Sequence, residues 1–217
     1  MKINILLFFA LILLFPNIAI SQTWPKIFVA PGDYSTGKVA YETYDNGIIL
    51  LSENLGNGVR SSGWLIKTDI NGNVLWERLI GRPEQYLSLT ENMEVTSDSG
   101  LIIAMGTKFL EPNPNEILGD PLFIKLNKCG QLDWCTLVSL HGTGNSGTDV
   151  VQTNDGYIGL YTNWNVHTND IGVVKMDFNG QIQWLFTYDN DTIVDNVPCD
   201  ILAIDDGSAI VDRKSVV

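Results

Sequence analysis

A ten-residue pattern that recurs along the chain constrains its fold more than any other feature of the sequence. The pattern is K-x-[DN]-x-x-G-x-x-x-W, and its copies run from Lys67 to Trp76, from Lys125 to Trp134 and from Lys175 to Trp184. Its fixed positions are Lys67, Asp69, Gly72, Trp76, Lys125, Asn127, Gly130, Trp134, Lys175, Asp177, Gly180 and Trp184. The tryptophans are 58 and 50 residues apart, a period typical of arrays in which one supersecondary unit is repeated.

A second motif alternates with the first. It is an Asp-Gly turn followed by an apolar run, found at Asp45–Gly47, Asp98–Gly100, Asp155–Gly156 and Asp206–Gly207. The last three glycines lie 24, 22 and 23 residues after the preceding motif tryptophans. Trp24 precedes Gly47 by 23 residues, so it fits the tryptophan position of an earlier copy.

Together the two motifs predict four short strands per repeat. The first strand ends at the Asp-Gly turn, the apolar run forms the second, the third carries the motif lysine and the fourth carries the motif tryptophan. Glycine supplies the positive φ that the tight turns need, and the aspartate can accept hydrogen bonds from turn N–H groups. We therefore expect an all-β chain of β-propeller-type, four-stranded antiparallel blades. The expected blades span residues 37–80, 90–139 and 147–188, with a truncated blade at 197–217.

The two motifs resemble the blade repeats of secreted β-propeller proteins of the Bacteroidota. The Asp-x-x-Gly-x-x-x-Trp core is also similar to the tryptophan docking motif of quinoprotein-like, PQQ-type propellers. The resemblance implies that Trp76, Trp134 and Trp184 pack between neighbouring blades. It also implies that Trp24 belongs to an N-terminal strand that completes the last blade, and that export uses the type IX secretion system.

About three full blades are fewer than the roughly four to eight of a closed propeller. We therefore expect an incomplete propeller, either the N-terminal part of a larger protein or an open array that closes with another copy. The open blade edges predict self-association of the isolated mature chain.

The first twenty-one residues have the build of a secretory signal peptide. Lys2 precedes an apolar run from Ile3 to Phe15, and Ala19-Ile20-Ser21 places small residues at a cleavage site. The run is too short to span a bilayer, and no later run is longer. We expect cleavage after Ser21, secretion to the cell surface or beyond, and a mature propeller domain over residues 22–217.

Charge limits the possible partners of the chain, and the cysteine count limits its possible disulfides. Asp and Glu number 25 against 13 Lys and Arg, which gives a net charge of −12 and argues against nucleic acid and anionic membranes. The odd count of three cysteines, Cys129, Cys135 and Cys199, leaves one unpaired within the chain, and Cys129 and Cys135 lie too far apart along an extended strand to pair. The expected partner is an unidentified protein or glycan.

The sequence predicts no catalytic, cofactor-binding or metal-binding residue. Paired carboxylates at Asp189 and Asp191 and at Asp205 and Asp206 are interpreted as turn residues rather than as an acid–base pair. The 69–73 loop lacks the later bidentate Glu of a calcium-binding EF-hand, so Asp69 is interpreted as a turn cap. Trp164, with Asn163, Asn165 and His167, could stack on a glycan or could pack within its loop.

These observations lead to an expectation of a secreted, non-catalytic binding or scaffold module without a cofactor. The alternative is part of an exported propeller enzyme, either carbohydrate-active or quinoprotein-like.

Overall fold

The computed structural model describes residues 26–29, 34–56, 60–81, 90–108, 119–140, 145–164, 169–188, 196–204 and 207–215. Within these ranges the regular secondary structure is entirely β. The strands are β1 (Tyr34–Glu42), β2 (Ile48–Gly56), β3 (Arg60–Thr68), β4 (Val74–Ile80), β5 (Thr90–Val95), β6 (Leu101–Lys108), β7 (Gly119–Leu126), β8 (Leu132–Leu137), β9 (Ser146–Thr153), β10 (Gly156–Trp164), β11 (Asn169–Met176), β12 (Ile182–Tyr188), β13 (Asn196–Ala203) and β14 (Ala209–Ser215).

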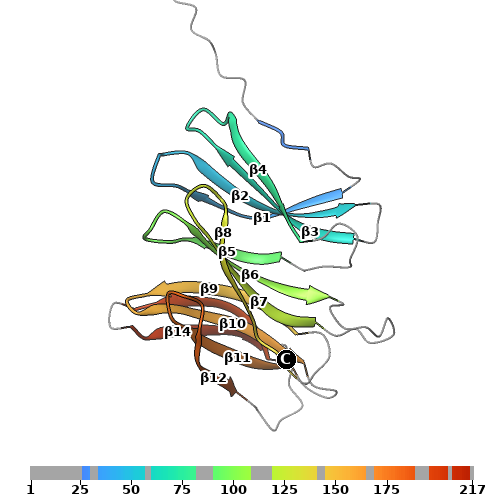
Figure 1. Ribbon diagram of the computed structural model, residues 1–217. Coiled ribbons are helices and arrows are strands. Elements are labelled where there is room, and N and C mark those ends of the chain that lie inside the picture. The colour runs from blue at the N-terminus through green and yellow to red at the C-terminus, as the bar shows by residue number, and fades with distance from the viewer. Residues whose placement is uncertain are drawn as a thin grey trace, which may run out of the picture.

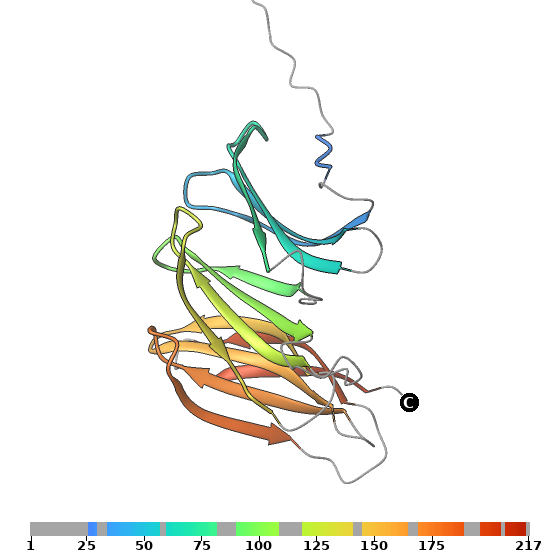
Figure 2. The same cartoon turned by 45° about the vertical axis from the view of Figure 1, so that its right-hand side comes forward.

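The strands form antiparallel sheets in simple meander order. Three sheets have four strands each, β1–β4, β5–β8 and β9–β12, and β13 pairs with β14 in a two-stranded sheet. The sheets are stacked one on the next, as two views of the ribbon show (Figures 1 and 2). The prediction of an all-β, propeller-type array of four-stranded blades is confirmed, and in the described part of the chain the array is open.

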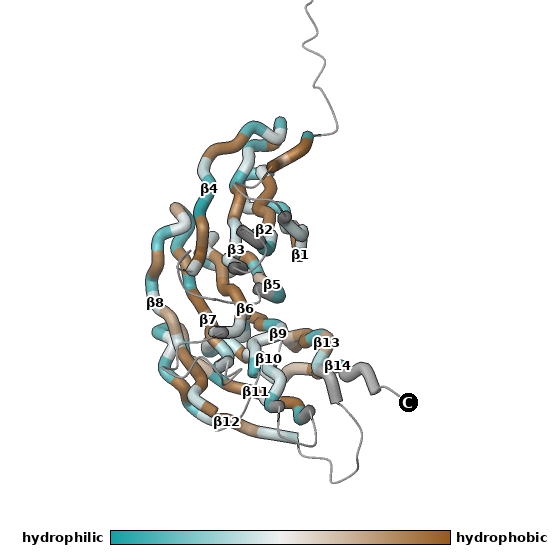
Figure 3. The backbone as a smooth tube through the Cα atoms, turned by 90° about the vertical axis from the view of Figure 1, so that its right-hand side faces the viewer, coloured by the Kyte–Doolittle hydropathy of each residue, from teal (hydrophilic) through white to brown (hydrophobic). Residues whose placement is uncertain are grey.

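The first strand of each sheet lies on the inner side of the array. Strands β1, β5, β9 and β13 contact one another in succession, with β9 against both β5 and β13. The last strands, β4, β8 and β12, follow the opposite side (Figure 3). The sheets therefore spread outward from a shared inner side, as blades of a propeller do.

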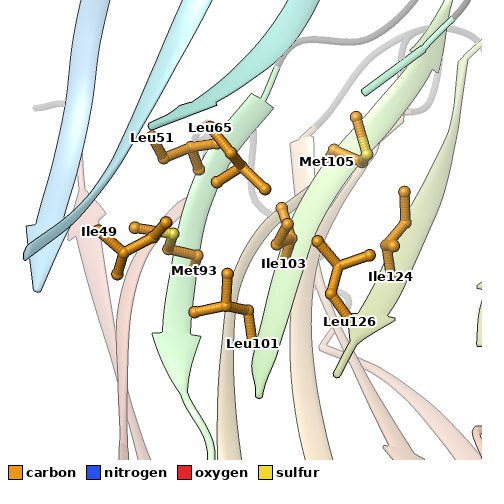
Figure 4. Packing of buried hydrophobic residues seen from close by; sticks show 9 residues of the cluster. All are labelled: Ile49, Leu51, Leu65, Met93, Leu101, Ile103, Met105, Ile124 and Leu126. Carbon is orange, nitrogen blue, oxygen red and sulfur yellow. The ribbon is translucent and has the colours of Figure 1, made fainter. Parts of the chain in front are cut away.

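Apolar cores fill the spaces between successive sheets. The first core joins Ile49, Leu51 and Leu65 of the first sheet to buried residues of β5, β6 and β7 (Figure 4). The second core lies between the second and third sheets around Phe123 and Tyr157. The third core packs β10 and β11 against Ile201 of β13. Because both faces of the second and third sheets are covered, their central strands are apolar runs rather than alternating patterns.

The open face of the first sheet is covered at one point by the described N-terminal segment. Phe28 packs against Trp64 and Ile66. Phe28 lies four residues after Trp24, the spacing of Ile80 from Trp76 and of Val138 from Trp134. Ile80 and Val138 pack into the first and second cores, so Phe28 occupies the matching position of the repeat. Trp24 and residues 1–21 lie outside the described residues.

Two further findings concern the surface. Cys129, Cys135 and Cys199 are exposed, and no disulfide joins them. Over the described ranges, the chain contains no helix that is long and apolar enough to cross a membrane.

Candidate functional site

The motif tryptophans join each sheet to the next one. Trp76 lies over Gly130, where an added Cβ would come within 2.9 Å of its ring, and Trp134 lies over Gly180, where the gap would be 2.5 Å. The Trp134 indole also donates a hydrogen bond of 3.0 Å to the Phe178 carbonyl. The tryptophan of each of these sheets therefore packs on the glycine of the hairpin in the next sheet.

Trp184 differs from its two counterparts. It is 47% exposed, and no hairpin lies over it in the part of the chain that the structure describes. The packing between blades that the resemblance implied for Trp184 is therefore absent from the described residues. The reason is that the sheet following β12 shows only β13 and β14, which lie over the inner part of the third sheet.

The motif lysines connect the two sequence motifs within each blade. Lys67 Nζ donates to Asp45 (2.9 Å), Lys125 Nζ donates to Asp98 (2.8 Å), and Lys175 is paired in the same way with Asp155. The lysines are buried, and the hydrogen bond from Lys67 lowers the pKa of Asp45 to about 2. Sequence reasoning found both motifs but did not predict this link.

The third motif position caps the hairpin between the third and fourth strands. Asp69 Oδ1 accepts hydrogen bonds from the N–H groups of Asn71 and Asn73, each 2.8 Å long. Asn127 and Asp177 cap their own hairpins through the same two-residue and four-residue contacts. These contacts explain why Asp or Asn occupies this position.

Most of the other residues that the sequence offered as candidate site residues lie outside the described residues. Asp189, Asp191, Asp205, Asp206, Asn165 and His167 lie outside the described residues. Asn163 is half-buried in β10, and the side chain of Trp164 lies outside the description as well.

A different group of side chains meets on the inner strands, where each strand has one irregularity. The pairing register shifts at Lys38 in β1, at Glu91 in β5, at Thr148 in β9 and at Cys199 in β13. An extra residue of this kind bends the strand and redirects the side chains beside it, and such bulges are frequent next to active sites. The residue after the bulge is Asn92 in β5, Asp149 in β9 and Asp200 in β13.

Asp149 is the centre of this group and links three sheets. Its Oδ1 accepts from Asn92 Nδ2 at 2.7 Å, and its Oδ2 accepts from the Ile201 N–H at 3.0 Å. The Ile201 N–H also donates to Asp200 Oδ1 at 2.9 Å, so the two carboxyl groups share a donor. Two residues after Asn92 on β5, Glu94 Oε2 accepts from the Gln152 N–H at 2.6 Å. We call Tyr41, Asn92, Glu94, Asp149 and Asp200 the inner-strand cluster.

The environment of the cluster changes the protonation of its acids. Asp149 is only 3% exposed, and burial raises its pKa to about 6. A hydrogen bond with Asp200 and the negative charge of Asp200 add to the rise, while the Val150 and Ile201 N–H groups oppose it. Burial also raises the pKa of Glu94, and burial together with Asp149, Glu94 and Asp200 raises the pKa of Tyr41.

This arrangement can hold and deliver a proton near neutral pH. A buried carboxyl group beside a carboxylate keeps a proton that an isolated aspartic acid would lose. Asp200 is exposed, whereas Asp149 is covered, so Asp200 is the member of the pair that a ligand can touch. Perturbed carboxyl pairs of this kind are typical of functional sites.

Sequence reasoning missed this cluster, although a signal was present. Asn92, Asp149 and Asp200 each lie four residues before the residue that opens the Asp-Gly turn, which is Thr96, Thr153 or Ile204. A polar residue at one fixed position of a buried inner strand is informative once the repeat has been aligned.

Comparison with known proteins supports the fold and gives no family. No protein-family model matches the chain, and no curated protein matches it significantly. Among solved structures, it is similar to an endo-arabinase from Bacteroides thetaiotaomicron, with a TM-score of 0.52 and 16% sequence identity. The alignment covers 86% of this chain and 74% of the endo-arabinase.

This similarity corrects the functional expectation. The sequence favoured a binding or scaffold module without catalysis, but a solved structure that shares the fold is an enzyme. That expectation fails because it weighed only motif and turn residues, and these are structural. At 16% identity the similarity shows the fold alone, so an activity for this chain is a proposal.

Proposed function

We propose that the chain forms blades of an exported propeller enzyme that hydrolyses a polysaccharide at the inner-strand cluster. One observation carries the proposal: buried Asp149 lies beside the exposed carboxyl group of Asp200 on the inner side of the array, where burial raises the pKa of Asp149 to about 6. Glycoside hydrolysis uses one carboxyl group as a proton donor and a second as a base or nucleophile. The cluster supplies acids on three neighbouring strands, β5, β9 and β13.

The roles follow from exposure and protonation. Asp200 is exposed and hydrogen-bonded to Asp149, so it passes the Asp149 proton to the leaving glycosidic oxygen. Asp149 is a positioning residue, since it is buried and holds β5, β9 and β13 together. Glu94, half-buried on β5, is the second carboxyl group, and exposed Tyr41 offers a ring and a hydroxyl to the sugar.

The class of substrate comes from the structural comparison. An endo-arabinase acts within an arabinose polymer, so arabinan is the first substrate to test. The net charge of −12 favours a neutral polysaccharide over a strongly anionic one.

The finer sequence-based expectations belong to the same proposal. We propose export through the 1–21 signal peptide, with a type IX route in keeping with the Bacteroidota-like repeats. The PQQ-type resemblance is restricted to the tryptophan docking motif. The position of Phe28 supports the proposal that residues 24–29 supply the fourth strand of a blade.

The experiment is a hydrolysis assay on a panel of neutral polysaccharides, with reducing ends and product sizes as readouts. The purified protein should release oligosaccharides from arabinan. Asp200→Asn and Glu94→Gln should each lower kcat by at least about a hundredfold. Glu77→Gln, an exposed carboxylate on the outer strand β4, is the matched control and should keep full activity. Activity that survives both cluster substitutions, or absence of activity on the whole panel, would contradict the proposal.

A further inference from the structure

The two oxygens of the buried Asp149 carboxyl group have unequal sets of hydrogen-bond donors. Oδ1 accepts from the Asn92 side-chain amide at 2.7 Å and from the Val150 N–H at 2.8 Å. Oδ2 accepts from the Ile201 N–H at 3.0 Å, the one donor that the described residues give it. A carboxyl oxygen has two lone pairs, so both lone pairs of Oδ1 are used and one of Oδ2 is available. A proton on Asp149 is therefore bound at Oδ2.

The available lone pair of Oδ2 lies next to Asp200. The Ile201 N–H donates to Asp149 Oδ2 and also to Asp200 Oδ1, at 2.9 Å, which places these two oxygens side by side. A proton on Oδ2 can therefore form the hydrogen bond to Asp200, the exposed member of the pair. A proton on Oδ1 would instead lie on the β5 side of the carboxyl group, away from the strand that carries Asp200.

Asn92 is held in the orientation that this arrangement needs. It follows the bulge at Glu91 in β5, and its own Oδ1 accepts from the Met93 N–H at 2.8 Å. Because the amide oxygen already has a donor, the amide nitrogen is the group that faces Asp149. Met93 is fully buried in the first core, so packing holds the backbone that fixes the Asn92 amide.

The ionisable groups around Asp149 do not distinguish its two oxygens in this way. Glu94 on β5, Asp200 on β13 and Tyr41 on β1 lie close to it, since burial and all three carboxyl groups raise the pKa of Tyr41. The other described charged side chains on the strands that contact β9 pair elsewhere: Glu91 with Lys38, Lys125 with Asp98, and Asp120 with the Leu140 N–H. Asn92 therefore supplies the side-chain donor that occupies Oδ1.

We propose that Asn92 is a positioning residue that directs the Asp149 proton to Oδ2, into the hydrogen bond with Asp200. The location of this proton does not depend on a substrate. Its use in hydrolysis rests on the proposed function. The net transfer is then one proton, from Asp149 Oδ2 through Asp200 to the leaving glycosidic oxygen, and it leaves both carboxyl groups ionised.

Carbon-13 NMR of protein labelled at aspartate follows the proton without a substrate, and Asp149→Asn identifies the Asp149 carboxyl signal. Asn92→Ala removes a hydrogen bond to the charged form of Asp149, so the titration midpoint of this signal should rise by about one pH unit. Glu91→Gln, one residue earlier on the same strand, is the matched control and should not raise the midpoint. An unchanged midpoint in Asn92→Ala, or an equal rise in Glu91→Gln, would overturn the proposal.

A double-mutant cycle tests which oxygen holds the proton. Asp200→Asn should lower the Asp149 midpoint in the otherwise unchanged protein, because the hydrogen bond with Asp200 and its charge raise the pKa of Asp149. Asn92→Asp keeps the shape of the side chain and places an acceptor beside Oδ1, so the proton moves to that oxygen. The effect of Asp200→Asn should then fall to about half or less. An equal effect of Asp200→Asn in both backgrounds would overturn the proposal, even if Asn92→Ala does not fold.

Kinetics separate this inference from the proposed function. If the unchanged protein hydrolyses arabinan, Asn92→Asp should lower kcat at least about tenfold with little change in KM, because the proton then lies on the oxygen away from Asp200. An unchanged kcat in Asn92→Asp would overturn the positioning role. If the unchanged protein is inactive, the proposed function is contradicted, and the NMR midpoints still decide where the proton lies.

Discussion

The buried lysine of each blade donates to the turn aspartate and to a second oxygen, which is a backbone carbonyl for Lys67 and Lys125 and the Thr153 hydroxyl for Lys175. Lys125, 2% exposed, donates to Asp98 and to the Leu126 carbonyl. Removing one partner of a buried pair costs several kcal/mol because the other charge is left without compensation. Asp98 is more than half exposed, and solvent screening reduces this cost.

We therefore predict that Asp98→Ala lowers the free energy of unfolding by about 2 kcal/mol. Adding Lys125→Met to this variant should restore part of the loss, because the uncompensated charge is then removed. Urea unfolding of the two variants measures the difference. A double variant less stable than Asp98→Ala alone would show that the lysine does not depend on the aspartate.

The protonation of Asp149 predicts an unusual dependence of stability on pH. Its folded pKa of about 6 lies above the ordinary value of 3.8, so the folded state keeps a proton that the unfolded state loses first. The contribution to stability is full below about pH 4, and it is lost as the pH rises through about 6. The loss is about 2–3 kcal/mol at most.

Chemical denaturation between pH 4 and pH 7 tests this prediction. The loss should be smaller in Asp200→Asn, because the negative charge that adds to the rise in the pKa of Asp149 is removed. The free energy of unfolding of the unchanged protein is compared with that of Asp200→Asn at each pH. If the difference in favour of the unchanged protein increases over this range, Asp149 is ionised in the folded state.

At the scale of elements, substitutions of two glycines distinguish the stability cost of backbone strain from the cost of displacing a tryptophan. Gly180 and Gly207 have φ of 77° and 85°, but only Gly180 lies beneath a tryptophan ring. Gly207→Ala should cost about 1 kcal/mol, from the left-handed backbone alone. Gly180→Ala should cost about 3 kcal/mol, because it also displaces Trp134.

Thermal or urea unfolding of these two variants gives the comparison directly. Similar losses in both would mean that Trp134 does not depend on the surface of the Gly180 hairpin.

The elements were predictable from the sequence because each blade repeats two local signals. The Asp-Gly turn ends the first strand, and the capped [DN]-x-x-G hairpin joins the third and fourth strands, so strand order follows from short-range chemistry. The bulges at Glu91, Thr148 and Cys199 were not predictable in the same way, because a bulge is a property of the pairing between strands. The inner-strand cluster depends on these bulges and on stacking of separate sheets, so the polar residue four positions before the turn marks it only once the repeats are aligned.

At the scale of the whole molecule, the proposed export predicts a defined mature end. The exported protein should begin at Gln22, because the Ala19-Ile20-Ser21 pattern follows a short apolar run. Intact mass and N-terminal sequencing of secreted material measure this directly. Recovery of exported protein that keeps Met1 would contradict the assignment of residues 1–21 as a signal peptide.

The most direct test of the central claim is the pH–rate profile of arabinan hydrolysis by the purified protein. If the proton of Asp149 reaches the leaving oxygen through Asp200, kcat/KM should fall as the pH rises through about 6, the pKa of Asp149. Asp200→Asn should abolish this limb together with the activity. A rate that stays constant or increases from pH 6 to about 8, or an unchanged profile in Asp200→Asn, would contradict a catalytic role for the inner-strand cluster.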